Sequence, residues 1–123
     1  MIKILVWGTG KIASQVFHNE LQAEILGFME TKKTIDEFCG YPVYGIDEIP
    51  VKYDYIVVAN TYVDEIYQEC KKNEIDMEKV IFLYGIKVQK GVKDLKIIEK
   101  ILGDKNCTNY CSEFSLLSGS FYE

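Results

Sequence analysis

The feature that most constrains the fold is a short apolar segment that runs into two glycines and then into an amphipathic helix. Residues Ile2–Trp7 (I-K-I-L-V-W) are rich in branched side chains, which predicts a buried strand. Gly8-Thr9-Gly10 follows at once, and the apolar residues of Lys11–Leu21 recur at the 3.6-residue spacing of a helix. This order predicts the first strand–helix unit of an α/β domain.

The same alternation continues along the chain. The remaining expected elements are strands at Glu24–Met29, Tyr41–Tyr44, Asp54–Ala59 and Lys79–Tyr84, helices at Tyr62–Lys72 and Val92–Leu102, and one helical turn at Ile46–Ile49. Residues 31–40 are polar and indicate a loop. The pattern predicts an α/β, three-layer Rossmann-like domain over residues 1–103, with a parallel sheet of about five strands and helices on both faces. Residues 104–123 are expected to be a C-terminal tail or the start of a missing catalytic domain.

Composition excludes several classes of partner. The 123 residues hold 14 Lys, no Arg and 19 acidic residues, for a net charge of −5. A nucleic-acid partner and an anionic membrane surface are therefore disfavoured, since both need a basic face. No apolar run approaches the ~20 residues of a membrane span, and the N-terminus does not resemble a signal peptide, so a cytoplasmic protein is expected.

Cysteine usage fits a reducing compartment without a metal site. A cytosolic setting would keep the four cysteines reduced. Cys107 and Cys111 are four residues apart, and the single histidine, His18, is distant in sequence. This spacing matches zinc motifs poorly, so no metal site is predicted.

The glycine turn carries the chemistry. The segment Gly8–Ala13 reads G-T-G-K-I-A, a G-x-G-x-x-A pattern placed between a strand and a helix, as in dinucleotide-binding proteins. Gly8 would permit the tight turn, and Gly10 would let a pyrophosphate approach the backbone at the positive end of the helix. Lys11 adds a cation. The predicted phosphate-binding residues are Gly8, Thr9, Gly10, Lys11 and Ile12.

A carboxylate follows the second expected strand. Glu30 lies 20 residues after Gly10, where it could accept hydrogen bonds from ribose hydroxyls. Its charge favours NAD over NADP, although Lys32 and Lys33 could neutralise a 2′-phosphate. Nucleotide-sugars and S-adenosylmethionine are alternative ligands. Binders of S-adenosylmethionine usually carry an acid just before the glycines, where this chain has Val6.

Polar residues also follow the strand at Asp54–Ala59. Asn60 and Thr61 are expected to face the glycine turn from the next strand, because ligands of open α/β sheets bind beyond the carboxyl ends of the strands. Alternatively, Thr61 caps the following helix and Asn60 completes a turn. No catalytic acid or base is apparent: His18 is interpreted as a surface residue, so no catalytic residue is predicted.

Four stretches carry a resemblance to a known family. They are K-I-L-V-W-G-T-G-K-I-A, I-L-G-F-M-E, G-Y-P-V-Y-G-I-D-E-I and Y-D-Y-I-V-V-A-N. Over about residues 2–86 the chain resembles the Rossmann-like N-terminal domain of bacterial polysaccharide- and sugar-modifying proteins, which include nucleotide-sugar dehydratases and epimerases, sugar acyltransferases and sugar methyltransferases. The resemblance implies that Gly8, Gly10 and Glu30 are nucleotide contacts and that the module is non-catalytic.

These observations predict a non-catalytic module that binds NAD or a nucleotide-sugar. The alternatives are a ligand-free interaction or scaffold domain and the N-terminal fragment of a sugar methyltransferase. The expected partners are the nucleotide, a catalytic domain beyond the C-terminus and, through the exposed edge strand at Tyr41–Tyr44, a second copy of the chain in a homodimer.

Overall fold

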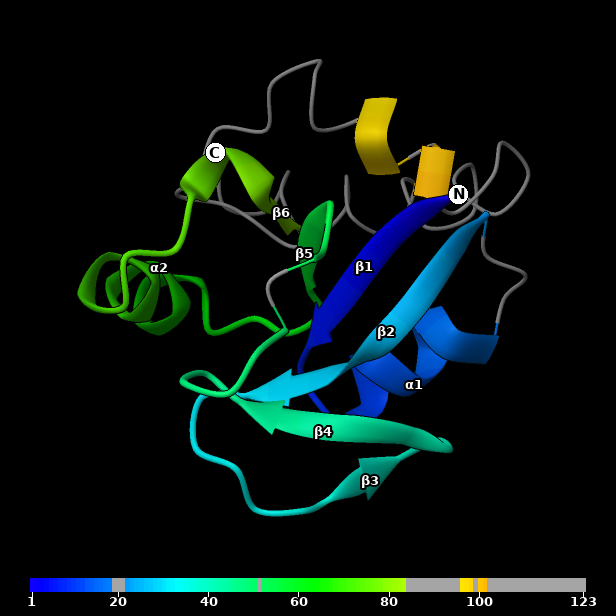
Figure 1. Ribbon diagram of the computed structural model, residues 1–123, viewed down its shortest axis with the longest axis horizontal. Helices are drawn as coiled ribbons and strands as arrows, with labels where there is room; N and C mark the ends of the chain where they lie inside the picture. Colours follow the sequence, from blue (N-terminus) through cyan, green and yellow to red (C-terminus); the bar gives the residue numbers. More distant parts are fainter. Residues whose placement is uncertain (19–21, 51, 84–95, 99, 102–123) are drawn as a thin grey trace, which may run out of the picture.

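A computed structural model of the chain describes residues 1–18, 22–50, 52–83, 96–98 and 100–101 (Figure 1). The strands are β1 (Ile2–Trp7), β2 (Ala23–Glu30), β3 (Glu37–Phe38), β4 (Tyr41–Gly45), β5 (Tyr55–Val58) and β6 (Val80–Phe82). The helices are α1 (Lys11–His18), α2 (Val63–Lys72) and the 3-10 helix η1 (Met77–Lys79). The strands form one mixed sheet in the order β3-β4-β2-β1-β5-β6.

Strand β1 lies inside the sheet and sets the register of its neighbours. It pairs in parallel with β2 on one side and with β5 on the other, so that Trp7 lies opposite both Met29 and Val58. The outer pairs β2–β4 and β5–β6 are also parallel, whereas β3 runs antiparallel to β4. The carboxyl ends of β1, β2 and β5 therefore meet at one edge of the sheet (Figure 1).

Side chains of β1 alternate between two apolar clusters. Ile4 and Val6 belong to one cluster, and Leu5 and Trp7 belong to the other, because successive strand residues point to opposite faces. All four side chains are at most 1% exposed. Burial on both faces explains why Ile2–Trp7 is almost continuously apolar.

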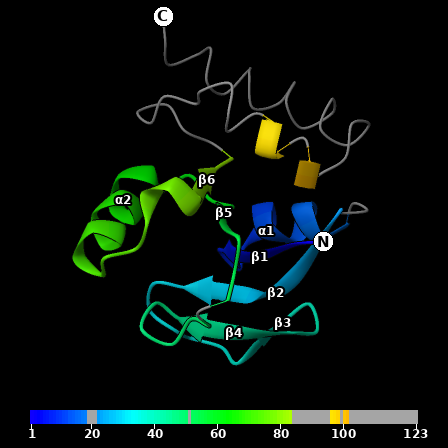
Figure 2. The same cartoon turned by 45° about the horizontal axis from the view of Figure 1, so that its top comes forward.

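One described α-helix joins each cluster. Ala13 of α1 belongs to the cluster of Ile4, and Ile66 and Cys70 of α2 belong to the cluster of Leu5. The described helical residues 96–98 and 100–101 add Ile97, Ile98 and Ile101 to the cluster of Ala13. Both views place this stretch beside the start of β1 (Figures 1 and 2).

The predicted fold class is wrong. The sequence predicts a three-layer Rossmann-like domain with a parallel sheet of about five strands and helices on both faces, whereas the sheet is mixed and has six strands. Its helices are few: in the described chain, the connections from β2 to β4 and from β4 to β5 contain turns and β3 but no helix. Those connections are polar or interrupted by Pro50, so they lack the apolar stripe that a covering helix needs. The prediction extended the two strand–helix–strand units to the whole domain.

Three local predictions also need correction. The strand predicted as an edge at Tyr41–Tyr44 lies between β2 and β3, so the pairing surface expected for a homodimer is occupied by β3. Residues 46–48 form a turn, closed by a hydrogen bond from the Glu48 N–H to the Gly45 carbonyl, in place of a helical turn. Helix α2 begins at Val63 and receives no side-chain cap, so Thr61 does not cap it.

Two predictions of secondary structure are confirmed within the described residues. Strand β1 has the predicted bounds, and the described part of Val92–Leu102 is helical with Ile98 and Ile101 buried. Cys39 and Cys70 are free thiols. Cys107, Cys111 and the tail at 104–123 lie outside the described residues. Among the helices that are described, none has the length and apolar character needed to cross a bilayer.

Gly27 is a structural glycine that the sequence analysis did not single out. A Cβ at this position of β2 would lie 2.7 Å from Cε2 of Tyr44 and 2.8 Å from the carbonyl oxygen of Pro42. We expect Gly27→Ser to lower the free energy of unfolding by about 1–3 kcal/mol, because the β4 backbone must shift. Urea denaturation measures this change. The matched control is Gly10→Ser, where a Cβ meets nothing within 4 Å; equal destabilisation of both variants would contradict this reading.

Candidate functional site

The candidate site lies where β1, β2 and β5 end. The chain passes from β1 to β2 and β4 on one side of the sheet and then crosses to β5 on the other side. The strand order therefore reverses between β1 and β5. In open sheets with parallel strands, ligands bind beyond the carboxyl ends at this point. Gly8 follows β1, and Asn60 comes two residues after the end of β5.

Gly8 is required by the fold itself. Its φ is +136°, a conformation that side chains rarely adopt, and a Cβ there would lie 3.0 Å from the carbonyl oxygen of Ala59. The Gly8 N–H donates to the carbonyl of Met29 at 2.9 Å. Gly8 thus turns the chain sharply between two strand ends, as the sequence analysis expects.

Gly10 differs from Gly8 in its backbone conformation and in the space around its Cα. Its φ lies outside the positive region in which glycine is favoured, and a Cβ there would meet no heavy atom within 4 Å. Gly10 precedes α1, and its carbonyl accepts the Ser14 N–H at 3.1 Å. The amide groups of Lys11, Ile12 and Ala13 have no partner within the helix, as at the start of any α-helix. The backbone beside Gly10 is therefore open where these N–H groups begin.

Thr9 and Glu30 connect the glycine turn to the end of β2. The Thr9 hydroxyl donates to Oε2 of Glu30 at 3.0 Å. Oε1 of Glu30 accepts the Thr34 N–H at 2.8 Å and the Ile35 N–H at 3.3 Å. The Thr34 hydroxyl lies 3.0 Å from each carboxylate oxygen. Glu30 thereby organises the loop after β2 and holds it against the glycine turn.

These contacts determine the ionisation of Glu30. Partial burial acts to raise its pKa, but the hydrogen bonds from Thr34, Thr9 and Ile35 outweigh burial and lower the pKa below the ordinary value of 4.5. The carboxylate is therefore charged at neutral pH. An anion at this position suits hydroxyl donors, such as those of a ribose, and repels a phosphate.

Hydrogen bonds of Trp7 and Asn60 also connect segments at this edge of the sheet. The Trp7 indole N–H donates to the Thr31 hydroxyl at 3.2 Å, which joins the end of β1 to the loop after β2. The Asn60 side-chain amide donates to the Trp7 carbonyl at 3.3 Å and accepts the Tyr62 N–H at 3.0 Å. Asn60 therefore completes the turn before α2, which was one of the two predicted interpretations.

The structure brings together only part of the predicted set. Thr9 is bonded to Glu30, and Asn60 is bonded to the carbonyl of Trp7, the residue before Gly8. Lys11 and Thr61 are exposed without a contact that joins them to this group among the described residues. Ile12 is half-buried against the apolar cluster of Ala13, so only its backbone N–H can face a ligand.

Sequence reasoning missed two hydroxyl residues of the loop after β2, one bonded to Trp7 and the other to Glu30. Thr31 and Thr34 belong to the stretch T-K-K-T, which the sequence analysis treats only as a polar loop. The signal that could have found them is a carboxylate followed by two hydroxyl residues, a combination that favours local side-chain to backbone hydrogen bonds. Two large apolar side chains are exposed here, Ile35 to 40% and Tyr62 to 65%. The backbone N–H of Ile35 bonds Glu30, and that of Tyr62 bonds Asn60.

A protein-family model matches the part of the chain that forms this edge of the sheet. The family model described as C2185-like, N-terminal, matches residues 1–81. The chain belongs to this family. The match extends from β1 into β6 and includes every predicted site residue. None of the curated proteins matches the chain.

The hydrogen bonds to Glu30 predict a stability that depends on pH. Since the pKa of Glu30 is lower in the folded state, its stabilising effect is complete above the ordinary, unfolded-state pKa of 4.5 and is lost as pH falls through the folded-state value. We expect Glu30→Gln to be less stable than the unsubstituted protein at pH 7 and the difference to shrink towards pH 3. Urea denaturation between pH 7 and pH 3 measures it. A difference that stays constant over this range would refute the prediction, and Glu24→Gln, at an exposed position of β2, controls for loss of one charge.

Proposed function

We propose that this chain is a non-catalytic nucleotide-binding domain of a cytoplasmic sugar- or polysaccharide-modifying protein. The ligand is NAD or a nucleotide-sugar, bound at the carboxyl ends of β1, β2 and β5. The observation that carries the proposal is the glycine at position 10. Neither its backbone conformation nor crowding by neighbours requires glycine there, and Ser, Asn or Asp would cap α1 better. A glycine at this position is explained by a ligand that needs the space.

The open backbone supports a phosphate group. The free N–H groups at the start of α1 and the positive end of its dipole stabilise an anion without any arginine. Lys11, the first residue of α1, is exposed and can approach the same anion. These groups suit the pyrophosphate shared by NAD and nucleotide-sugars.

Glu30 supports a ribose and discriminates against a 2′-phosphate. Its carboxylate is charged at neutral pH and adjoins the glycine turn through Thr9. Lys33, which could have offset that charge, lies 3.3 Å from Oδ1 of Asp36 and 4.0 Å from Oε2 of Glu48. The expected preference is therefore NAD over NADP.

The lowered pKa of Glu30 supports a role without catalysis. A general base works best with a pKa near the working pH, and the pKa of Glu30 is well below neutral pH. The family description names an N-terminal domain, which fits a binding module that precedes a catalytic one. The chemistry would then be carried out by residues outside this domain.

A ligand-free scaffold domain is the second candidate. The observation that favours it is that Thr9, Glu30 and Asn60 are hydrogen-bonded within the chain. These bonds explain the three side chains as supports of two loops, although they leave Gly10 unexplained.

A thermal-shift screen separates the candidates. We expect NAD or a UDP-sugar to stabilise the protein, since a ligand bound only to the native state adds about 2.7 kcal/mol at one hundred times its Kd. NADP is expected to stabilise it less than NAD. S-adenosylmethionine is included because stabilisation by that ligand alone would favour a methyltransferase fragment. Stabilisation by none of the four would favour the scaffold.

Substitution of Gly10 tests the site itself. We expect Gly10→Val to abolish nucleotide binding in calorimetric titrations while the fold survives, because the side chain occupies the space of the phosphate. Gly10→Ser is the sharper variant: serine is a better helix cap, so stability should stay the same or rise by a few tenths of a kcal/mol while binding weakens. Unchanged affinity in both variants would exclude phosphate binding at this turn.

A further inference from the structure

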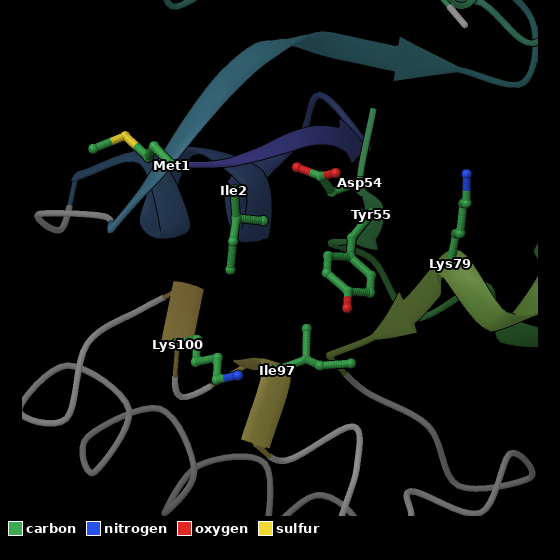
Figure 3. Close-up of a pocket in the computed structure, with 7 residues that line it drawn as sticks. All are labelled: Met1, Ile2, Asp54, Tyr55, Lys79, Ile97 and Lys100. Atoms are coloured by element: carbon green, nitrogen blue, oxygen red, sulfur yellow. The ribbon is translucent and has the colours of Figure 1, made fainter. Parts of the chain in front are cut away.

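A second cleft lies at the opposite end of the same strands. It has a volume of about 550 Å³, and its described lining residues are Met1, Ile2, Asp54, Tyr55, Lys79, Ile97 and Lys100 (Figure 3). Ile2 begins β1 and Tyr55 begins β5, so the cleft lies at the amino ends of strands whose carboxyl ends form the nucleotide site. The six residues of β1 separate the two places by about 20 Å. The volume is that of a site for a small molecule.

The lining combines an apolar wall with polar groups that converge. Ile97, 7% exposed, and the half-buried Ile2 and Tyr55 supply apolar surface. The Tyr55 hydroxyl and the Lys100 ammonium both point toward the Ile97 side chain, from two sides of it (Figure 3). They come from β5 and from the helical residues 96–98 and 100–101, two segments far apart in sequence.

The described lining residues include more lysines than acids, whereas the chain as a whole is acidic. Two lysines, Lys79 and Lys100, and one aspartate, Asp54, are among the described lining residues of this cleft, in a protein of net charge −5. Asp54 is already engaged, since its Oδ2 accepts the Lys3 N–H at 2.8 Å. Its Oδ1 accepts no hydrogen bond from the other described residues and is left for a donor.

Lys79 belongs to the opposite wall. Its ammonium lies 5.6 Å from the centroid of the Tyr53 ring, a weak cation–π contact at an exposed position. The long, flexible side chain can leave this contact and turn toward an anion in the cleft. Lys100 therefore supplies the first ammonium group for a bound anion, and Lys79 supplies the second.

We propose that this cleft binds a small organic anion that also carries a hydroxyl group. Lys100 and the Tyr55 hydroxyl hold the anionic group, Lys79 joins them, and Oδ1 of Asp54 accepts the ligand hydroxyl. The carbon skeleton of the ligand packs against Ile2 and Ile97. This second site is independent of nucleotide binding at the glycine turn.

The test uses glycerol 3-phosphate as the probe and NMR amide shifts as the readout. We expect its shifts to centre on Tyr55 and Ile97, and we expect glycerol, without the anion, and inorganic phosphate, without the hydroxyls, to bind at least about tenfold more weakly. Lys100→Gln should raise the Kd about tenfold and Tyr55→Phe several-fold. Lys72→Gln, at the end of α2, is the matched control and should leave the Kd within twofold.

Several results would overturn the proposal. They are no binding of the probe, shifts that centre away from the cleft, equal binding of glycerol, or equal weakening by Lys72→Gln and Lys100→Gln. Gly10→Val should leave the affinity for glycerol 3-phosphate unchanged. Failure of this second site is therefore distinguishable from failure of the nucleotide site.

Discussion

The parallel pairing of β1 with β2 and with β5 is the constraint on which the other features depend. Trp7 lies opposite both Met29 and Val58, so three strands end at the same level. This shared ending places the glycine turn beside Glu30 and Asn60. The same pairing aligns the amino ends of β1 and β5, where Ile2 and Tyr55 line the second cleft.

Glycines act in three different ways in this small domain. At Gly8 the backbone conformation and the nearby Ala59 carbonyl both demand glycine, and at Gly27 the crowding comes from β4. Gly10 is needed for neither reason. This contrast is why Gly10, and not the G-x-G pattern as a whole, supports a ligand. A glycine that folding does not need is informative about binding, whereas the others are informative about packing.

Glu30 links local structure to the proposed function. Its hydrogen bonds with Thr34 and Ile35 order the loop after β2, and its bond with Thr9 fixes that loop against the glycine turn. The same bonds keep the carboxylate ionised. A binding residue that is already held in place loses little conformational freedom when a ligand arrives. The hydrogen bonds that hold Glu30 in place therefore agree with both interpretations of the site, as a scaffold and as a binding site.

Sequence patterns alone predicted β1, the glycine turn, most of the helices and the strands at β2, β5 and β6, because local periodicity and glycine chemistry act over a few residues. They predicted the fold class wrongly, because the two strand–helix–strand units were extended to connections without an apolar stripe, and because β3, which forms a hairpin with β4, lies in a segment predicted as a polar loop. The individual site residues Gly10 and Glu30 were visible in the sequence. Only the tertiary structure showed that Thr9 bonds Glu30, that Asn60 bonds the carbonyl of Trp7, and that Tyr55 and Lys100 line one cleft, since each arrangement depends on which segments are neighbours.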